Sequence, residues 1–562
     1  MGGSGSGRAG KGFAMRIRLN DIPVEIAENE SYFDAAVRLN QAEGTLAVMV
    51  KGETLSLNAP ASHGDAVLLT YRDEEGRRVY ERSLRFVMLL AFETLYPQAR
   101  VRCENSLGNG VYVTVRGLKL TADVLSAVEA KMREITQANL PFTLVPTSRS
   151  AAIRYFAGRG DDDKVKLLKY RPYEHFRMYE CGGMMEYFYG EMARGTGDVR
   201  VFSLTLLDSG FVFMLPDPAN PAVPSPYKPM PKLLSTYRES ARWLEILAVE
   251  NAADLNELTV SGRLREFIRV NEALMDRKIY DIADQIVHSR ARLVLIAGPS
   301  SSGKTTFCNR LMIALKVTGL TPVKLSLDDY YIDRDKVPLD EHGQPDLECV
   351  EALDTELLGH QLKQLLEGER VNVPTFDFNA QKRGEKTHEL MVDSTSPILI
   401  EGIHGLNDRL TPGIPREAKF KIYISALTNL NIDEHNRIRS TDARLIRRIV
   451  RDAASRGTHP EKTLLMWSSV RRGEDQNIFP FQEDADAMIN SSLVYELAVM
   501  KNYVYPMLTA VTPDAPYYTL ARRLVKFLNY IQAADVEDEI PLNSLLREFV
   551  GGSCFYREEG KA

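Results

Sequence analysis

The pattern of apolar and polar positions is clearest in the middle of the chain. Residues 292–297 (RLVLIA) are almost wholly apolar and predict a buried strand, and residues 305–317 repeat apolar side chains at helical spacing. A Gly/Ser-rich stretch joins the two. Two further apolar runs of strand length, 323–327 and 397–400, are each followed by an acidic residue. This order predicts an α/β domain with a parallel sheet.

The region before this domain predicts two smaller units. From 15 to 76, a strand pair, a helix beginning at Ser31 and two more strand-like runs give a ββαββ order, which predicts a β-grasp module. From 77 to 225, an apolar helix at 83–92 and a strand at 109–115 predict an α+β unit. The chain is therefore expected to be a multidomain α/β protein. The predicted segments are an added leader (1–14), the β-grasp module (15–76), the α+β unit (77–225), a helical connector (226–289), the α/β domain (290–533) and a tail (534–562).

Composition sets limits on the class of protein. With 562 residues, 44% apolar and 26% charged, the chain resembles globular proteins of several domains. The net charge of −6 argues against a surface that coats nucleic acid throughout. Five scattered cysteines without a C-x-x-C pattern indicate reduced thiols and a cytoplasmic location. No apolar run approaches the ~18 residues of a membrane helix, and the leader lacks the apolar middle of a signal peptide, so no membrane partner is expected.

The Gly/Ser-rich stretch carries the first candidate chemistry. Residues 298–306 (GPSSSGKTT) fit G-x-x-x-x-G-K-[ST] between a strand and a helix, which is typical of a nucleotide phosphate loop. The glycines let backbone N–H groups face phosphate oxygens, and the helix start adds a positive dipole end. Lys304 is expected to reach the β- and γ-phosphates, and Thr305 to ligate Mg²⁺. The residues expected to bind ATP or GTP are Gly298, Ser300, Ser301, Ser302, Gly303, Lys304, Thr305 and Thr306.

Two acidic residues follow the later strands. Asp328 comes directly after the run 323–327, at the end of a strand where parallel sheets place their ligands, and it can accept a proton from an attacking hydroxyl group. A solvated acidic turn is the alternative for Asp328. Glu401 ends the run 397–401 and is expected to hold Mg²⁺, directly or through water.

A basic helix is expected at 444–456. Arg444, Arg448 and Arg451 lie near one helical face, and Arg447 is a turn away from Arg444 and Arg451. In a lid that closes over a triphosphate, such groups neutralise charge on the transferred phosphoryl group. A solvated basic face and an RNA contact are the alternatives. The expected catalytic set is Asp328, Lys304, Arg448 and Arg451.

Together with PTFDF at 374–378 and RRIVRD at 447–452, these motifs resemble the uridine kinase family, which is related to phosphoribulokinase and pantothenate kinase. The resemblance covers the predicted domain 290–533. It implies phosphoryl transfer from ATP or GTP to the 5′-hydroxyl of a nucleoside, with Asp328 as the base.

The departures from the family lie mainly in the substrate pocket. The family's Y-D-F-x-x-H segment begins at Phe376 and ends at Gln381 here, and the acid that grips the ribose hydroxyls appears as Glu348. The family's R-G-R reads R-G-T at 456–458. Since hydrogen-bonding groups decide which analogues a site rejects, the preferred base stays open. The resemblance implies substrate contacts from Tyr331, Glu348, Phe376, Phe378, Gln381 and Arg383.

The front of the chain resembles another family. Residues 15–76 resemble the TGS domain of threonyl-tRNA synthetases and some GTPases, and 77–225 resemble the editing-like domain that follows it in those synthetases. The metal-site pairs H-x-x-x-H and C-x-x-x-H of that family fall on Arg82, Phe86, Cys181 and Met185. Three of these four positions lack a metal ligand, and only Cys181 keeps the family's residue. The resemblance therefore implies that metal-dependent hydrolysis is lost, that Cys181 is a packed thiol and that the domain binds or scaffolds.

Two other functions remain open at this point. In the first, the chain is a kinase whose acceptor is a sugar phosphate or another small alcohol. In the second, the chain is an RNA-binding or regulatory protein that is switched by nucleotide. The front modules are compatible with RNA contact, effector sensing or assembly into a homo-oligomer.

Overall fold

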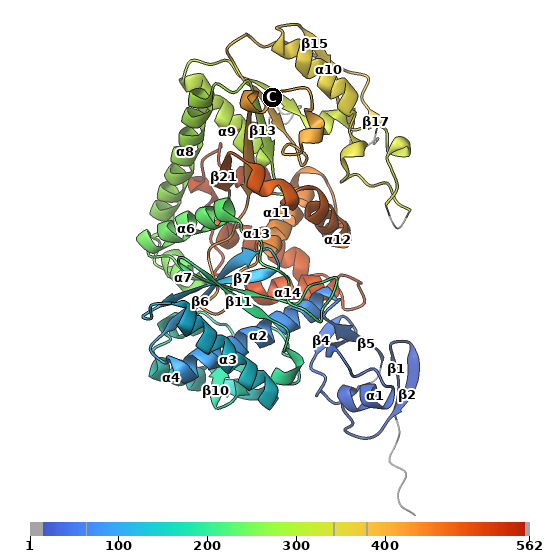
Figure 1. Ribbon diagram of the computed structural model, residues 1–562, viewed down its shortest axis with the longest axis vertical. Helices are drawn as coiled ribbons and strands as arrows, with labels where there is room; N and C mark the ends of the chain where they lie inside the picture. Colours follow the sequence, from blue (N-terminus) through green and yellow to red (C-terminus); the bar gives the residue numbers. More distant parts are fainter. Residues whose placement is uncertain (1–14, 63, 341–342, 378–379, 381, 557–562) are drawn as a thin grey trace, which may run out of the picture. The chain divides into compact units, whose positions relative to one another are not determined.

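The computed structural model describes residues 15–62, 64–340, 343–377, 380 and 382–556 (Figure 1). The chain forms two compact units. Unit 1 consists of Met1–Lys228, Asp433–Arg437 and Thr509–Asn529. Unit 2 consists of Pro229–Ile432, Ile438–Leu508 and Tyr530–Ala562. Unit 1 thus takes in two segments from within the stretch 290–533, and the domain boundaries expected from the sequence stay predictions.

Unit 1 begins with a five-stranded sheet. Its strands are β1 (Met15–Leu19), β2 (Ile22–Ile26), β3 (Thr45–Val50), β4 (Glu53–Leu55) and β5 (Asp65–Thr70), in the order β2-β1-β5-β3-β4. The strand pair expected around Asn20 and Asp21 is confirmed, and both residues have positive φ in the turn. The helix α1 (Tyr32–Arg38) starts as expected at Ser31, whose hydroxyl accepts the N–H of Asp34 in a capping box.

The rest of unit 1 packs two smaller sheets with helices around one apolar core. The long helix α2 (Glu74–Leu95) extends beyond the predicted 83–92 at both ends. Most of its residues are buried in a core shared with strands from both sheets. The sheets are β11-β12-β7-β6 and β10-β9-β8, formed by β6 (Arg100–Leu107), β7 (Gly110–Arg116), β8 (Thr143–Ser148), β9 (His175–Cys181), β10 (Met184–Glu186), β11 (Ser203–Leu207) and β12 (Gly210–Met214). The helices are α3 (Ala122–Ala138), α4 (Arg149–Arg159), α5 (Asp162–Lys169) and α14 (Tyr518–Leu528).

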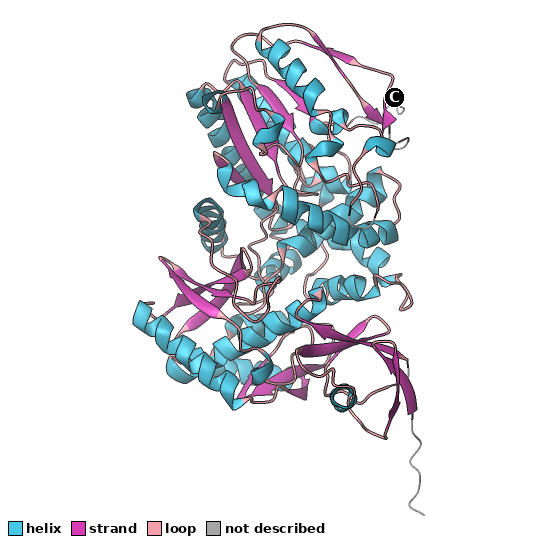
Figure 2. Ribbon diagram, turned by 45° about the vertical axis from the view of Figure 1, so that its right-hand side comes forward, coloured by secondary structure: helices cyan, strands magenta, loops and turns pink. Residues whose placement is uncertain are grey.

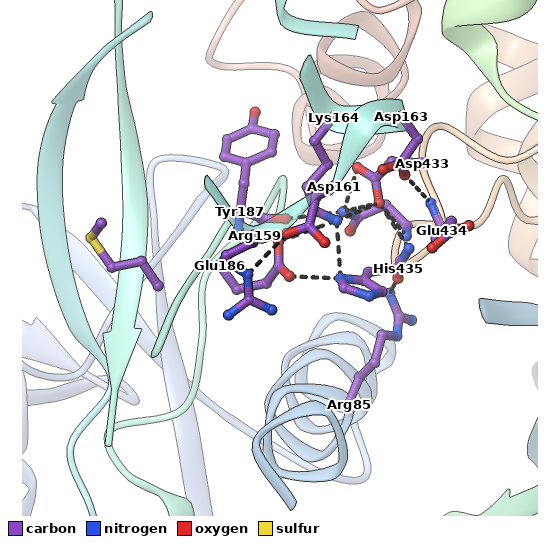
Figure 3. A network of polar contacts seen from close by, with 12 residues as sticks. Arg85, Arg159, Asp161, Asp163, Lys164, Glu186, Tyr187, Asp433, Glu434 and His435 are labelled. Carbon is purple, nitrogen blue, oxygen red and sulfur yellow. Dashed lines mark hydrogen bonds and ion pairs between the residues drawn. The ribbon is translucent and has the colours of Figure 1, made fainter. Parts of the chain in front are cut away.

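A buried polar network ties the segment Asp433–Arg437 into unit 1 (Figure 3). Lys164 of α5 forms ion pairs with Asp433 at 3.3 Å and with Glu186 at 3.4 Å, and His435 Nδ1 lies 2.6 Å from Glu186 Oε2. Burial opposes ionisation of Glu186, but the charges of Lys164 and His435 outweigh it and lower the pKa of Glu186 to about 2. These buried ion pairs therefore hold the segment Asp433–Arg437 within unit 1.

Unit 2 is built on a parallel sheet with strand order β14-β19-β13-β20-β21 (Figure 2). The strands are β13 (Leu293–Ala297), β14 (Val323–Ser326), β19 (Ile398–Glu401), β20 (Lys419–Ser425) and β21 (Ala487–Asn490), and all neighbouring pairs run parallel. The parallel sheet expected from the sequence is confirmed. Two short strand pairs lie outside it: β15 (Val371–Val373) with β18 (His388–Leu390), and β16 (Phe376–Asp377) with β17 (Lys382–Arg383).

Helices flank this sheet. They are α6 (Pro231–Ile246), α7 (Ala252–Val260), α8 (Leu264–Ser289), α9 (Lys304–Val317), α10 (Thr355–Leu366), α11 (Ser440–Ser455), α12 (Pro460–Asn477), α13 (Glu496–Thr509) and the short α15 (Arg547–Val550). The helical connector expected at 226–289 contains α6, α7 and α8. Of the helices in the described ranges, none combines the length and apolar character needed to cross a membrane.

Candidate active site

The phosphate loop joins β13 to α9, as the sequence predicts. Gly298 leaves the strand so close to its neighbour that an added Cβ would lie 1.9 Å from the carbonyl oxygen of Ile424. Gly303 caps α9 with a φ of +84°, a conformation that side chains with a Cβ rarely adopt. The loop therefore needs glycine at both positions. Ser301 and Ser302 are buried, and neither hydroxyl has a hydrogen-bond partner within the described part of the chain.

Lys304 is folded back onto the loop. Its Nζ donates to the carbonyl oxygens of Gly298, at 2.9 Å, and Pro299, at 3.3 Å. Burial lowers the pKa of Lys304, while the charges of Glu401 and Asp328 act in the opposite direction. The ammonium group therefore shares its electrostatic surroundings with both carboxylates.

Thr305 and Glu401 meet at the carboxyl end of the sheet. Thr305 Oγ1 donates to Glu401 Oε1 at 3.2 Å, and Ser326 Oγ donates to the same oxygen at 3.4 Å. Burial is the main cause that raises the pKa of Glu401, although Lys324 Nζ lies 3.6 Å away. A cation at this point would relieve the penalty on the buried carboxylate.

The oxygen atoms of Thr305 and Glu401 are of the kind that binds Mg²⁺. Hydroxyl and carboxylate oxygens are the ligands that Mg²⁺ prefers, and it keeps several water or phosphate oxygens besides. Among the residues that the structure describes, no group of three or more His, Cys, Asp or Glu side chains is arranged to hold a metal ion. The residues fit an ion that is held jointly with a bound phosphate, and they do not form a complete protein cage.

Asp328 lies near these groups, and its charge acts on the pKa values of Lys304 and Glu401. It lies in the short 3₁₀ turn Leu327–Tyr330 that follows β14, and its backbone N–H donates to Ser326 Oγ at 3.3 Å. The side chain of Asp328 is exposed, but the many protein atoms nearby remove part of its hydration. This desolvation raises the pKa of Asp328, although the charges of Lys304, Arg456 and Arg451 favour its ionised form. A carboxylate of this kind can accept a proton from a bound hydroxyl group.

Two of the four arginines of α11 brace the phosphate loop from behind. Arg444 donates to the carbonyl oxygen of Ser300 at 3.0 Å, and Arg447 donates to that of Ser301 at 3.3 Å. Both side chains are fully buried, and each is paired with a buried glutamate, Arg444 with Glu474 and Arg447 with Glu496. Their charges are therefore already compensated within the protein.

The other two arginines are only partly buried. Arg448 Nη1 donates to Ser300 Oγ at 2.8 Å, and burial lowers the pKa of Arg448. Arg451 Nη2 donates to Asp452 Oδ1 at 2.9 Å, and its charge acts on both Lys304 and Asp328. Both arginines are partly accessible, so they can meet a bound phosphate.

The comparisons with known proteins fall on the same region. Residues 293–497 match the model of the Phosphoribulokinase / Uridine kinase family. A uridine kinase from Staphylococcus epidermidis RP62A is 30% identical over 202 residues, which make up 36% of this chain and 88% of that kinase. The chain belongs to the phosphoribulokinase/uridine kinase family.

Two further proteins are similar to parts of the chain. The threonine–tRNA ligase of Acidiphilium cryptum JF-5 is 35% identical over 192 residues in the N-terminal region, or 33% of this chain. The chain spans 30% of the length of that ligase. Among solved structures, D-glycerate 3-kinase from Cryptococcus neoformans var. grubii aligns with 47% of this chain and 89% of its own, at 15% identity and a TM-score of 0.22.

Three of the residues expected to contact the substrate, Glu348, Tyr331 and Phe376, lie near one another. Glu348 packs against Gly473 of α12, and burial raises its pKa to about 7 against the charges of Arg448 and Lys304. Tyr331 donates its hydroxyl to the carbonyl oxygen of Leu347, and its ring centroid lies 5.6 Å from that of Phe376. The charges of Asp328 and Glu348 both raise the pKa of Tyr331, so these side chains lie near one another.

Three further expected substrate contacts have different outcomes. Arg383 pairs with Asp354 at 3.0 Å, and its backbone N–H donates to Asp333, so its side chain already has an anionic partner. Phe378 and Gln381 lie outside the described residues.

The sequence reasoning missed the acidic partners of the loop. Glu474 accepts the N–H of Ser300 at 3.0 Å and pairs with Arg444 and Arg471. Glu548 accepts both the N–H and the hydroxyl of Thr306. Neither glutamate belongs to a recognisable motif, so only the folded chain reveals them.

Proposed function

We propose that the protein is a nucleoside kinase that transfers the γ-phosphoryl group of ATP to the 5′-hydroxyl of a nucleoside. The family membership supports a small-molecule phosphotransferase. One observation supports the reaction most directly: Lys304, Asp328 and Glu401 come from three different elements, the charges of both carboxylates act on the pKa of Lys304, and the charge of Lys304 acts on the pKa of each carboxylate. The loop lysine and the candidate base are thus near enough to interact electrostatically.

In the proposed reaction, Lys304 turns from the loop carbonyls to the phosphates, and the loop N–H groups hold their oxygens. Thr305 and Glu401 would hold Mg²⁺, which would supply further positive charge when bound. The acceptor oxygen forms its bond to the γ-phosphorus as the bond from that phosphorus to the β–γ bridging oxygen breaks. The hydroxyl proton passes to Asp328, while Arg448 and Arg451 stabilise the charge on the transferred group.

On the acceptor side, Glu348 is proposed to accept the ribose hydroxyls, and Tyr331 and Phe376 to border the base. The replacement of the family's tyrosine by Phe376 removes a hydroxyl group from the pocket. This departure supports an altered base preference and keeps a kinase of another small alcohol or sugar phosphate as the second candidate.

The front of the chain is proposed to be a TGS-like module followed by an editing-like domain. The ligase similarity over the N-terminal region supports this, as does the order β2-β1-β5-β3-β4 of the first sheet. At two of the four former metal positions, Arg82 donates to the carbonyl oxygen of Glu191, and Phe86 is fully buried among aromatic rings. The domain is therefore proposed to bind or scaffold, and not to hydrolyse.

An acceptor screen tests the proposal. The full-length chain is incubated with labelled ATP, Mg²⁺ and each acceptor in turn: the common nucleosides, sugar phosphates, glycerate and pantothenate. Label transfer to one or more nucleosides at the 5′ position supports the function. Transfer only to a non-nucleoside alcohol would support the second candidate, and transfer to none would refute both.

A further inference from the structure

The C-terminal segment 544–550 packs directly against the phosphate loop in unit 2. Ser544 Oγ donates to Glu272 Oε1 of α8 at 2.5 Å, and Arg547 donates to the carbonyl oxygens of Glu537 and Ile540. The ring of Phe549 lies 4.9 Å from the guanidinium carbon of Arg447, which itself braces the loop. The segment is therefore held in place by contacts just before the short helix α15 and within it.

These contacts bring Glu548 to the start of α9. Glu548 Oε2 accepts the backbone N–H of Thr306 at 3.1 Å and the Thr306 hydroxyl at 2.7 Å. Thr306 is the third residue of α9, so its N–H is one of the four that have no partner inside the helix. It is also one of the loop residues expected to hold phosphate.

A carboxylate and a phosphate cannot share these donors. Both are anions that are attracted to the same helix start, and each N–H group makes one strong hydrogen bond. Ser301 and Ser302, in the same loop, keep buried hydroxyl groups that have no partner among the described residues. The loop therefore retains unused donors for a ligand, while the donors of Thr306 are occupied by the chain itself.

We propose that Glu548 is an internal competitor for the nucleotide phosphates, and that the segment 544–550 must release Thr306 before ATP binds fully. This inference rests on the proposed function, because it assumes that the loop binds ATP. In this proposal, only molecules in which Glu548 has released Thr306 bind nucleotide fully. The apparent affinity for nucleotide therefore falls as the fraction of molecules held by Glu548 rises. A change that loosens the C-terminal segment would therefore activate the protein.

The test compares full-length wild type with E548Q, which keeps the shape of the side chain and removes its charge. The matched control is E539Q, which removes the charge that Glu539, in the same tail, pairs with the exposed Arg269 of α8 and leaves the loop untouched. ATP binding in the presence of Mg²⁺ is measured by calorimetry. We expect E548Q to bind ATP about fivefold more tightly or better, and E539Q to bind like wild type.

A second measurement guards against a variant that misfolds. In the wild-type protein, saturating ATP is expected to increase hydrogen exchange at the backbone amides of 546–550, because the segment is displaced. Equal or weaker ATP binding by E548Q, or unchanged hydrogen exchange in that segment, would overturn the inference. The proposed function would still stand if the wild-type protein had kinase activity. Failure of both wild type and E548Q to bind ATP would overturn both.

Discussion

Arg447 and Glu496 form an ion pair that is almost completely shielded from solvent, and the same arginine donates to the carbonyl oxygen of Ser301 in the phosphate loop. Glu496 opens α13, whereas Arg447 lies in the middle of α11. The pair therefore fixes the loop to two helices through the carbonyl oxygen of Ser301.

The first prediction concerns this brace. Glu496→Gln leaves the Arg447 charge buried without its counter-charge, and we expect it to lower the free energy of unfolding of unit 2 by about 3–5 kcal/mol. Both tryptophans of the chain, Trp243 and Trp467, lie in unit 2, so urea denaturation followed by tryptophan fluorescence reports on this unit. Glu389→Gln, which breaks the exposed pair with Arg370, is the control and should change the value by about 1 kcal/mol at most. Equal effects of the two variants would contradict a bracing role.

The second prediction concerns the metal. Thr305→Val removes a hydroxyl oxygen that lies 3.2 Å from Glu401, and we expect the Mg²⁺ concentration for half-maximal activity to rise about tenfold or more. Thr318→Val removes an exposed hydroxyl at the far end of α9 and serves as the control. A Mg²⁺ requirement that stays the same in Thr305→Val would exclude Thr305 as a ligand.

The third prediction is a pH dependence of acceptor binding. Burial raises the pKa of Glu348 to about 7, so this side chain is largely neutral below pH 7 and ionised above it. If the ionised form accepts the ribose hydroxyls, KM for the acceptor falls as pH rises through about 7. Glu348→Gln should raise KM and flatten this profile, while KM for ATP keeps its own pH dependence.

The raised pKa of Glu348 also has a consequence for stability. Between pH 4.5 and about 7, the unfolded chain releases this proton before the folded chain does, so the Glu348 contribution to stability falls with rising pH. Glu348→Gln should remove this part of the pH dependence from the tryptophan-detected unfolding of unit 2. A pH dependence of unfolding identical to wild type would show that Glu348 titrates normally.

The fourth prediction concerns the polar network of unit 1. Burial alone would raise the pKa of Glu186, but the charges of Lys164 and His435 lower it to about 2. The contribution of Glu186 to stability is therefore present above pH 4.5 and is lost as the pH falls towards 2. Glu186→Gln should lower the melting temperature of unit 1 at pH 7 and reduce its further fall on acidification, as measured by calorimetry. Glu174→Gln, which breaks an exposed pair with Arg149, is the control. A variant that melts like wild type at both pH values would rule out the network as a stabilising element.

Much of the fold of unit 2 follows from local patterns. The apolar run before Gly298, the helical spacing after Gly303 and the acid-terminated runs at 323–327 and 397–400 predict β13, α9, β14 and β19, all of which the structure contains. These signals are local because a buried strand and an amphipathic helix each impose their own period on the sequence. The position of Asp328 and Glu401 at one edge then follows from the parallel arrangement.

The partners of the arginines could not be predicted in the same way. The helical spacing groups Arg444, Arg447, Arg448 and Arg451, but it does not show that two of them are neutralised by Glu474 and Glu496, which lie 30 and 49 positions further along the chain. Glu548 lies 242 positions from Thr306. Such pairs form only when distant helices pack, so no short-range pattern encodes them.

The most direct test of the account is the turnover of Asp328→Asn with the best nucleoside acceptor, measured beside its ATP affinity. Because asparagine cannot accept the hydroxyl proton, we expect kcat to fall by roughly two orders of magnitude or more while the Kd for ATP stays near the wild-type value. Asp335→Asn, an exposed neighbour in sequence, should retain full turnover. Unchanged kcat in Asp328→Asn would contradict the central claim that this carboxylate is the base of a kinase.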